Sequence, residues 1–74
     1  MADTTFNGSR LRALRLAAGL RREDLAVTLR RSARSVANWE MGVSAPRGDD
    51  PGLIATALHV GIEELYRDTP AAVA

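Results

Sequence analysis

The 74-residue sequence predicts an all-α domain built from five short helices. Apolar residues recur three and four positions apart, which is the spacing of a helix face buried on one side. Helix-capping residues precede these apolar runs, and glycines follow them. A chain of this length forms one domain with a thin core. We expect residues 1–8 to be a flexible arm, 9–67 the folded domain and 68–74 a disordered tail.

The composition argues against secreted, membrane-spanning and thiolate-metal proteins. The sequence has no cysteine, which excludes disulfides and thiolate metal sites and fits a reducing cytoplasm. It also lacks an apolar run of the length that crosses a bilayer and the layout of a signal peptide. We therefore expect a cytoplasmic protein without a cofactor, a metal, a membrane partner or a small-molecule ligand.

Charge is distributed unevenly along the chain although the net charge is only +1. Residues 10–34 hold eight arginines against two acids, which gives +6, and residues 35–74 hold two arginines against six acids, which gives −4. Asp3 supplies the last −1, and no lysine is present. Arginine offers a planar fork that suits phosphate and guanine. This layout favours a domain that docks one face on a polyanion, and the alternative is a solvated charged surface.

The first helix is predicted to begin at Arg10, with Ser9 as its N-cap and Gly19 after its last turn. Its apolar face comprises three residues at helical spacing, Leu11, Leu14 and Ala18. Arg15 falls beside this apolar stripe. An arginine in that place needs a carboxylate partner or must extend its head group to solvent.

The second helix begins near Arg22, with two acids in its first turn as the helix dipole favours. Its buried face comprises Leu25, Ala26 and Leu29. Arg30 and Arg31 then interrupt the apolar pattern before Ser32. Two helices separated by so short a turn are the layout of a helix-turn-helix motif.

The third helix spans residues 33–40, between the N-cap Ser32 and Gly42. Val36 and Trp39 lie three residues apart and share the buried face, so we expect Trp39 in the core. The opposite face carries Ala33, Arg34, Ser35 and Asn38. Because arginine and asparagine can bond base edges bidentately, we interpret helix 33–40 as a recognition helix for DNA. The alternative is a solvated polar face.

Two further helices complete the predicted fold. Prolines and glycines mark residues 43–52 as a loop, and Asp50 is expected to cap a fourth helix with Pro51 at its first position. Its apolar residues are Leu53, Ile54, Ala57, Leu58 and Val60. Gly61 separates it from a short last helix over residues 62–67.

These elements resemble the lambda-repressor-like, Cro/Xre-type helix-turn-helix regulators over roughly residues 10–66. The matching positions are Arg10-Leu11-Arg12, Leu14-Arg15, Gly19-Leu20, Leu25-Ala26, Leu29, Ser32, Val36, Trp39-Glu40, Gly42, Pro46, Ala55, Ala57-Leu58, Val60 and Glu64-Leu65. The resemblance implies a five-helix DNA-binding domain that controls transcription in a prokaryotic or phage system. It also implies a dimer on an inverted repeat, and a buried ion pair between Arg15 and Glu40.

The sequence departs from the family pattern at four places. Arg21 replaces the usual Ser or Thr cap of the second helix, and Arg22 replaces a glutamine that contacts phosphate. Arg30 stands where the turn usually has glycine, so a left-handed conformation there would cost about 1–2 kcal/mol. The loop after Pro46 is longer than usual, because Gly48 and Gly52 prevent an early start of the fourth helix.

These patterns assign roles to particular residues. Base readout is expected from Ala33, Arg34, Ser35 and Asn38. Phosphate contacts, which set register without carrying sequence, are expected from Arg21, Arg22, Arg31, Ser32 and Arg47. Leu65 and Tyr66 are the expected contacts of a weak homodimer.

Two other functional classes need to be considered. A protein-interaction module on the same scaffold, such as an antitoxin-like subunit or a cofactor of another regulator, would use the apolar and acidic C-terminal half. An enzyme is not expected, because one histidine, no cysteine and no glycine-rich phosphate loop leave no nucleophile and base to combine.

Overall fold

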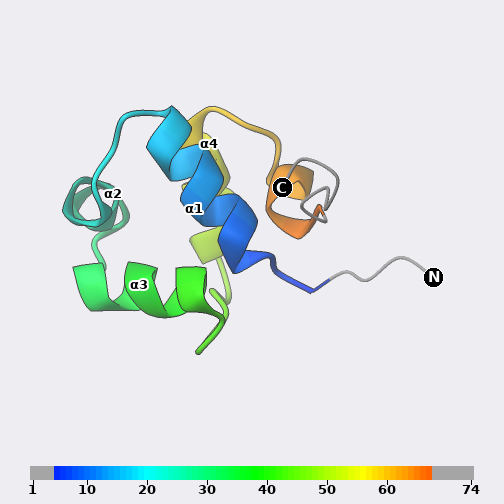
Figure 1. Ribbon diagram of the computed structural model, residues 1–74, viewed down its shortest axis with the longest axis horizontal. Coiled ribbons are helices and arrows are strands. Elements are labelled where there is room, and N and C mark those ends of the chain that lie inside the picture. The colour runs from blue at the N-terminus through cyan, green and yellow to red at the C-terminus, as the bar shows by residue number, and fades with distance from the viewer. Residues whose placement is uncertain (1–4, 68–74) are drawn as a thin grey trace.

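Four α-helices and a final 3₁₀ helix form the computed structural model, which describes residues 5–67 (Figure 1). The elements are α1 (Gly8–Ala17), α2 (Arg22–Leu29), α3 (Ala33–Met41), α4 (Asp50–Leu58) and η1 (Ile62–Tyr66). Residues 5–67 contain no strand, so the all-α class is confirmed there. The fifth predicted helix is a 3₁₀ segment and not an α-helix. None of the described helices is long and apolar enough to cross a membrane.

Helix α1 begins two residues before the predicted start. The cap is Asn7 and not Ser9, since the Asn7 side-chain oxygen accepts a hydrogen bond from the Arg10 amide at 3.0 Å. Gly8 makes this start possible, because a Cβ there would collide with the carbonyl oxygens of Trp39 and Glu40 in the last turn of α3. The backbone amide of Asn7 also donates to the Leu65 carbonyl at 2.7 Å. The last residues of the predicted arm therefore belong to the folded domain, whereas residues 1–4 and 68–74 lie outside the described range.

The turns between the helices use left-handed residues. Arg30 ends α2 with φ 57° and ψ 42°, which is the conformation expected where the family pattern has glycine. The amide of Arg31 reaches back to the Ala26 carbonyl at 2.9 Å and closes this turn. Helix α4 begins at Asp50, one residue before Pro51, and Asp49 takes the N-cap position that was predicted for Asp50. Its last residue is Leu58, and the C-cap His59 that follows is also left-handed.

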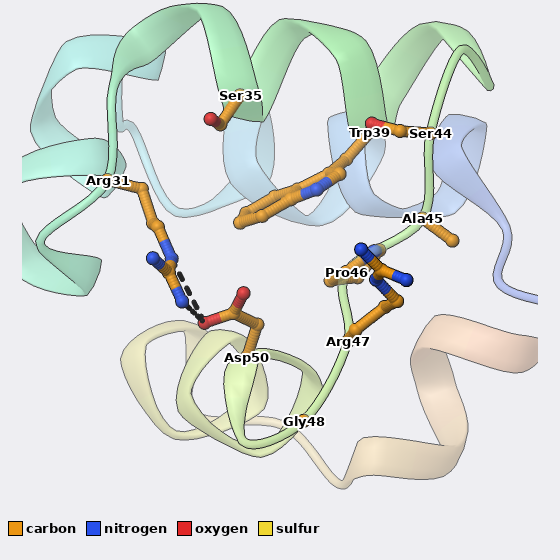
Figure 2. A pocket seen from close by; sticks show the side chains of 9 residues that line it. All are labelled: Arg31, Ser35, Trp39, Ser44, Ala45, Pro46, Arg47, Gly48 and Asp50. Carbon is orange, nitrogen blue, oxygen red and sulfur yellow. Dashed lines mark hydrogen bonds and ion pairs between the residues drawn. The ribbon is translucent and has the colours of Figure 1, made fainter.

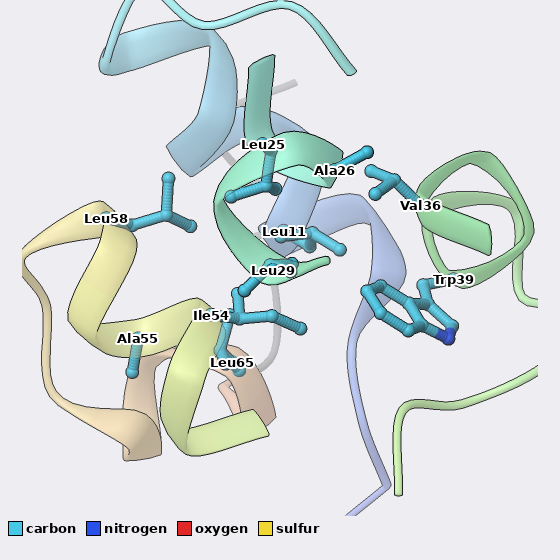
Figure 3. Packing of buried hydrophobic residues seen from close by; sticks show 10 residues of the cluster. All are labelled: Leu11, Leu25, Ala26, Leu29, Val36, Trp39, Ile54, Ala55, Leu58 and Leu65. Atoms are coloured by element: carbon cyan, nitrogen blue, oxygen red, sulfur yellow. The ribbon is translucent and has the colours of Figure 1, made fainter. Parts of the chain in front are cut away.

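One hydrophobic core joins all five elements (Figure 3). Helices α1 and α2 both pack on α3, and α2 and η1 pack on α4. The core residues are Leu11, Leu25, Ala26, Leu29, Val36, Trp39, Ile54, Ala55, Leu58 and Leu65. Trp39 thus lies in the core, as predicted, and the apolar face of α3 is fixed against α1 and α2.

A buried ion pair joins α1 to α3. The Arg15 Nε donates to Glu40 Oε2 at 2.5 Å, and the two side chains are only 7% and 1% exposed. Arg15 also donates to the Leu20 carbonyl at 2.8 Å, and Arg22 donates to Glu40 Oε1 at 3.1 Å. The pair implied by the family resemblance is present. It also explains how an arginine is tolerated beside the apolar stripe of α1, because its charge and its donors are met inside the protein.

Glu40 remains ionised although it is buried. Burial raises the pKa of its carboxyl, but the hydrogen bonds from Arg15 and Arg22, together with their positive charges, outweigh burial and hold the pKa below its ordinary value. The carboxylate is therefore a constant negative charge at the centre of the interface between α1, α2 and α3.

Breaking the pair from one side is expected to destabilise the fold more than removing it from both sides. Arg15→Met and Glu40→Met each strand a buried charge and should cost about 3–5 kcal/mol, whereas the double variant restores an uncharged interface. Urea melts of the wild type, both single variants and the double variant give the coupling free energy, which should exceed about 1 kcal/mol. A double variant that folds where a single variant does not would show the coupling directly. Additive costs would contradict it.

Acidification is expected to destabilise the protein through Glu40. Because the pKa of Glu40 is lower in the folded state than its ordinary 4.5, its contribution to stability is present above that value and is lost as the pH falls through the folded-state pKa. Urea melts between pH 7 and pH 3 should show this loss, and the Arg15→Met/Glu40→Met double variant should show a weaker dependence. Glu63→Gln, at an exposed glutamate outside any ion pair of residues 5–67, is the matched control. An unchanged pH dependence in the double variant would contradict the assignment.

Candidate nucleic-acid interface

Helix α3 is fixed at both ends and along its inner face. At its start the Ser32 hydroxyl accepts a hydrogen bond from the Ser35 amide at 3.1 Å, and at its end Gly42 adopts φ 77°. Val36 and Trp39 are buried, and Glu40 is tied to Arg15. The caps and the buried side chains therefore fix the orientation of α3, and the side chains of its outer face are not needed for this.

Arg34 and Asn38 are the polar side chains of that outer face. Arg34 is exposed and Asn38 is half-buried, and within residues 5–67 neither side chain has a hydrogen-bond or ion-pair partner. They lie four residues apart, so both point to the same side of the helix. A guanidinium and a carboxamide held side by side without internal partners are available to acceptors and donors outside the protein.

The other two predicted base readers are placed differently. Ala33 is half-buried and packs against the hydrophobic core, so only part of its methyl group is open to solvent. The Ser35 hydroxyl lies 3.1 Å from the Ser32 hydroxyl, and Ser35 lines a hollow between α3 and the start of α4. The structure thus separates the predicted set, with Arg34 and Asn38 on the outer face and Ser35 at the rim of this hollow.

Most of the predicted phosphate contacts already have carboxylate partners. Arg21 pairs with Asp24 at 3.0 Å on the surface, where the hydrogen bonds from the Arg21 guanidinium and its amide hold the pKa of Asp24 below its ordinary value. Arg22 is anchored to Glu40, as described above. Its side chain is 41% exposed, so it extends from the buried carboxylate to the surface.

Arg31 and Arg47 flank a hollow between α3 and the start of α4 (Figure 2). The hollow is lined by Arg31, Ser35, Trp39, Ser44, Ala45, Pro46, Arg47, Gly48 and Asp50. Arg31 reaches across to Asp50, whereas Arg47 is exposed and without a partner in the described part of the chain. Two cations and a serine hydroxyl around one concavity are suited to a phosphate group.

Asp50 has a role that sequence reasoning missed. The sequence marked it only as a helix cap, but it is buried and bonded to Arg31 across 19 residues of chain. No local pattern signals such a pair, because an aspartate before a proline looks the same whether it caps a helix or meets a distant arginine.

The predicted dimer contacts need a correction. Leu65 is fully buried in the core, so its side chain is not available to a second copy. Tyr66 is half-buried and meets Phe6 edge-on, with ring centroids 5.8 Å apart. Leu65 is the buried residue of η1, which packs on both α4 and α1. The large apolar side chains exposed on α4 and η1 are Leu53 and Ile62.

Comparison with known proteins agrees with a helix-turn-helix domain. The family model described as a helix-turn-helix domain matches residues 8–67. The restriction-modification controller protein C.AhdI from Aeromonas hydrophila is 36% identical, with 80% of this chain and 89% of that chain covered and a TM-score of 0.75. No curated protein sequence matches the chain significantly.

Two structures of the P22 c2 repressor share the fold. The crystal structure of its complex with synthetic operator 9T is 25% identical and has a TM-score of 0.79, over 86% of this chain and 97% of that chain. The solution structure of its DNA-binding domain, 24% identical, covers 95% of this chain and 97% of that chain and has a TM-score of 0.78, which supports the fold alone. The chain therefore belongs to the helix-turn-helix domain family, among the DNA-binding regulators of the Cro/Xre and lambda-repressor-like type.

Proposed function

We propose that the chain is a sequence-specific transcriptional regulator that inserts α3 into the major groove of an operator. The observation that carries this proposal is the outer face of α3, where Arg34 and Asn38 stand without partners in the described structure. The P22 c2 repressor, which shares the fold, was crystallised with an operator. The proposal includes no catalytic activity and places the protein in the cytoplasm.

Base readout is assigned mainly to two side chains. Arg34 lies in the first turn of α3, the part of a recognition helix that meets base edges, and its fork matches the O6 and N7 acceptors of guanine. Asn38 lies one turn further and best matches adenine. The exposed part of the Ala33 methyl can meet a thymine methyl, and Ser35 contributes at the edge of the interface.

Phosphate contacts are assigned to the residues around this face. Arg47 is exposed and uncommitted, and Ser32 is exposed at the start of α3. Three paired arginines also contact phosphate while they stay close to the carboxylates of Asp24, Glu40 and Asp50, and these are Arg21, Arg22 and Arg31. Such contacts fix the orientation of the domain on the duplex and carry no sequence information.

A dimer on an inverted repeat follows from the small size of the reading surface. One recognition helix contacts about three or four base pairs, which is too few for useful genomic specificity, and a two-fold copy doubles the contacts. The exposed apolar side chains Leu53 and Ile62, together with the half-buried Tyr66, are the candidate contacts of a weak homodimer. Half-sites are expected about 10 base pairs apart, centre to centre.

Removing the Arg34 guanidinium is expected to relax the sequence preference at one position of each half-site. Arg34→Ala should cost about 1–3 kcal/mol on the best operator, because a bidentate contact to guanine is lost. Arg34→Lys should recover only part of the loss, since it keeps the charge but not the fork. Binding-site selection followed by sequencing measures both. Arg12→Ala, at an exposed arginine of α1, is the matched charge control.

Two other results would contradict base readout by Arg34, and they have different meanings. In the first, Arg34→Ala loses affinity equally on every duplex and selects the same sequence as the wild type. That result would show that Arg34 contacts only phosphate. A wild type that selects no preferred fragment would instead favour the protein-interaction module.

Arg47 is expected to contribute to the salt dependence of binding and not to its specificity. If Arg47 neutralises one phosphate, Arg47→Ala should lower the slope of log affinity against log salt by about 0.9 per protomer. Titrations of one operator duplex between 50 and 200 mM salt measure the slope. The preferred sequence should stay the same, and a shifted preference would show that Arg47 contacts a base.

A further inference from the structure

The Arg31–Asp50 pair lies within the proposed DNA interface and has unequal exposure. The Arg31 side chain is 50% exposed, whereas the Asp50 side chain is only 11% exposed. Asp50 Oδ1 accepts hydrogen bonds from Arg31 Nη2 at 3.0 Å and from Arg31 Nε at 3.3 Å. Both side chains line the hollow, and the half-exposed Arg31 guanidinium reaches across it to the nearly buried Asp50 carboxylate at the start of α4 (Figure 2).

We propose that Asp50 is a built-in competitor of DNA phosphate for Arg31 and sets the overall affinity of the domain for DNA. This inference rests on the proposed function, because it concerns a residue expected to contact phosphate. Asp50 lies at the start of α4 and not on the outer face of α3, so it should lower affinity for every duplex without altering which sequence is preferred.

Burial of Asp50 is the reason for the competition. If a phosphate draws Arg31 away, it leaves behind a carboxylate that water reaches poorly, and such a charge is costly without its partner. If the phosphate shares Arg31 in place, two negative groups approach one cation and repel each other. Either arrangement weakens the phosphate contact relative to an arginine that has no partner.

The surface pair between Arg21 and Asp24 does not act in the same way. The Arg21 side chain is 76% exposed and that of Asp24 is 38% exposed, so water and salt can solvate either group when they part. Glu40 differs as well, since it keeps Arg15 when Arg22 moves. Among the phosphate candidates of residues 5–67, Arg31 is therefore the one whose release leaves a buried carboxylate alone.

The test is an isosteric substitution that removes the charge and keeps the hydrogen-bond acceptor. Asp50→Asn should bind DNA about threefold to tenfold more tightly at low salt, since repulsion between the carboxylate and a phosphate disappears. The gain should be equal on the selected operator and on a shuffled duplex. The salt slope should steepen by up to about 0.9 per protomer, because Arg31 then neutralises a phosphate fully.

Two further variants isolate the cause. Asp49→Asn makes the same change of charge at the neighbouring residue, which is exposed, lies outside the hollow and has no ion pair in the described range. It should change affinity less than Asp50→Asn. In an Arg31→Gln background, Asp50→Asn should raise affinity no more than Asp49→Asn does, because the shared cation is gone and only the change of overall charge remains. Thermal melts in parallel establish that each variant is folded.

The possible results separate this inference from the proposed function. A wild type that binds a preferred sequence while Asp50→Asn binds no more tightly, or more weakly, would overturn the inference alone. Equal gains from Asp49→Asn and Asp50→Asn would overturn it too, because bulk charge would then explain both. A folded wild type that binds no DNA would overturn the proposed function together with the inference.

Discussion

The buried carboxylate of Glu40 is the constraint on which the position of the recognition helix depends. It sits in the last turn of α3 and binds Arg15 of α1 and Arg22 of α2, so one anion joins three helices. An apolar contact there would allow α1 and α3 to shift slightly against each other. The bidentate ion pair between Arg15 and Glu40 instead fixes the direction in which the guanidinium and the carboxylate approach. The close approach of Gly8 to the end of α3 adds a steric limit on the same junction. The orientation of the outer face of α3 is therefore set by contacts on the opposite, buried side of the helix.

The arginines of the chain fall into classes set by their partners. Arg15 is structural and buried, whereas Arg22 and Arg31 connect the interior to the surface through Glu40 and Asp50. Arg34 and Arg47 have no partner within residues 5–67. A net charge of +1 is compatible with a DNA-binding role, because cations without partners in the described chain, Arg34 and Arg47, lie on the proposed interface. Selectivity is expected from geometry more than from bulk charge.

Helix order, most of the core residues and the oddly placed Arg15 were predictable, because helical periodicity is a local property of the sequence. Ala18 and Leu53 were wrongly placed on apolar faces, since both are exposed. Three features were not predictable. The cap at Asn7 depends on how closely Gly8 can approach α3, and the pairing of Arg31 with Asp50 depends on how α4 folds back. The burial of Leu65 depends on how η1 packs on α4 and α1. Each of these is a tertiary consequence that local patterns do not encode.

The central proposal is that a helix held by the core reads DNA sequence through its outer face. The most direct measurement is selection of bound duplexes from a random library by the wild-type protein, followed by sequencing. We expect strong enrichment of two related half-sites in inverted orientation, each containing a guanine and a neighbouring adenine. A bound pool with the same sequence composition as the starting library would contradict it.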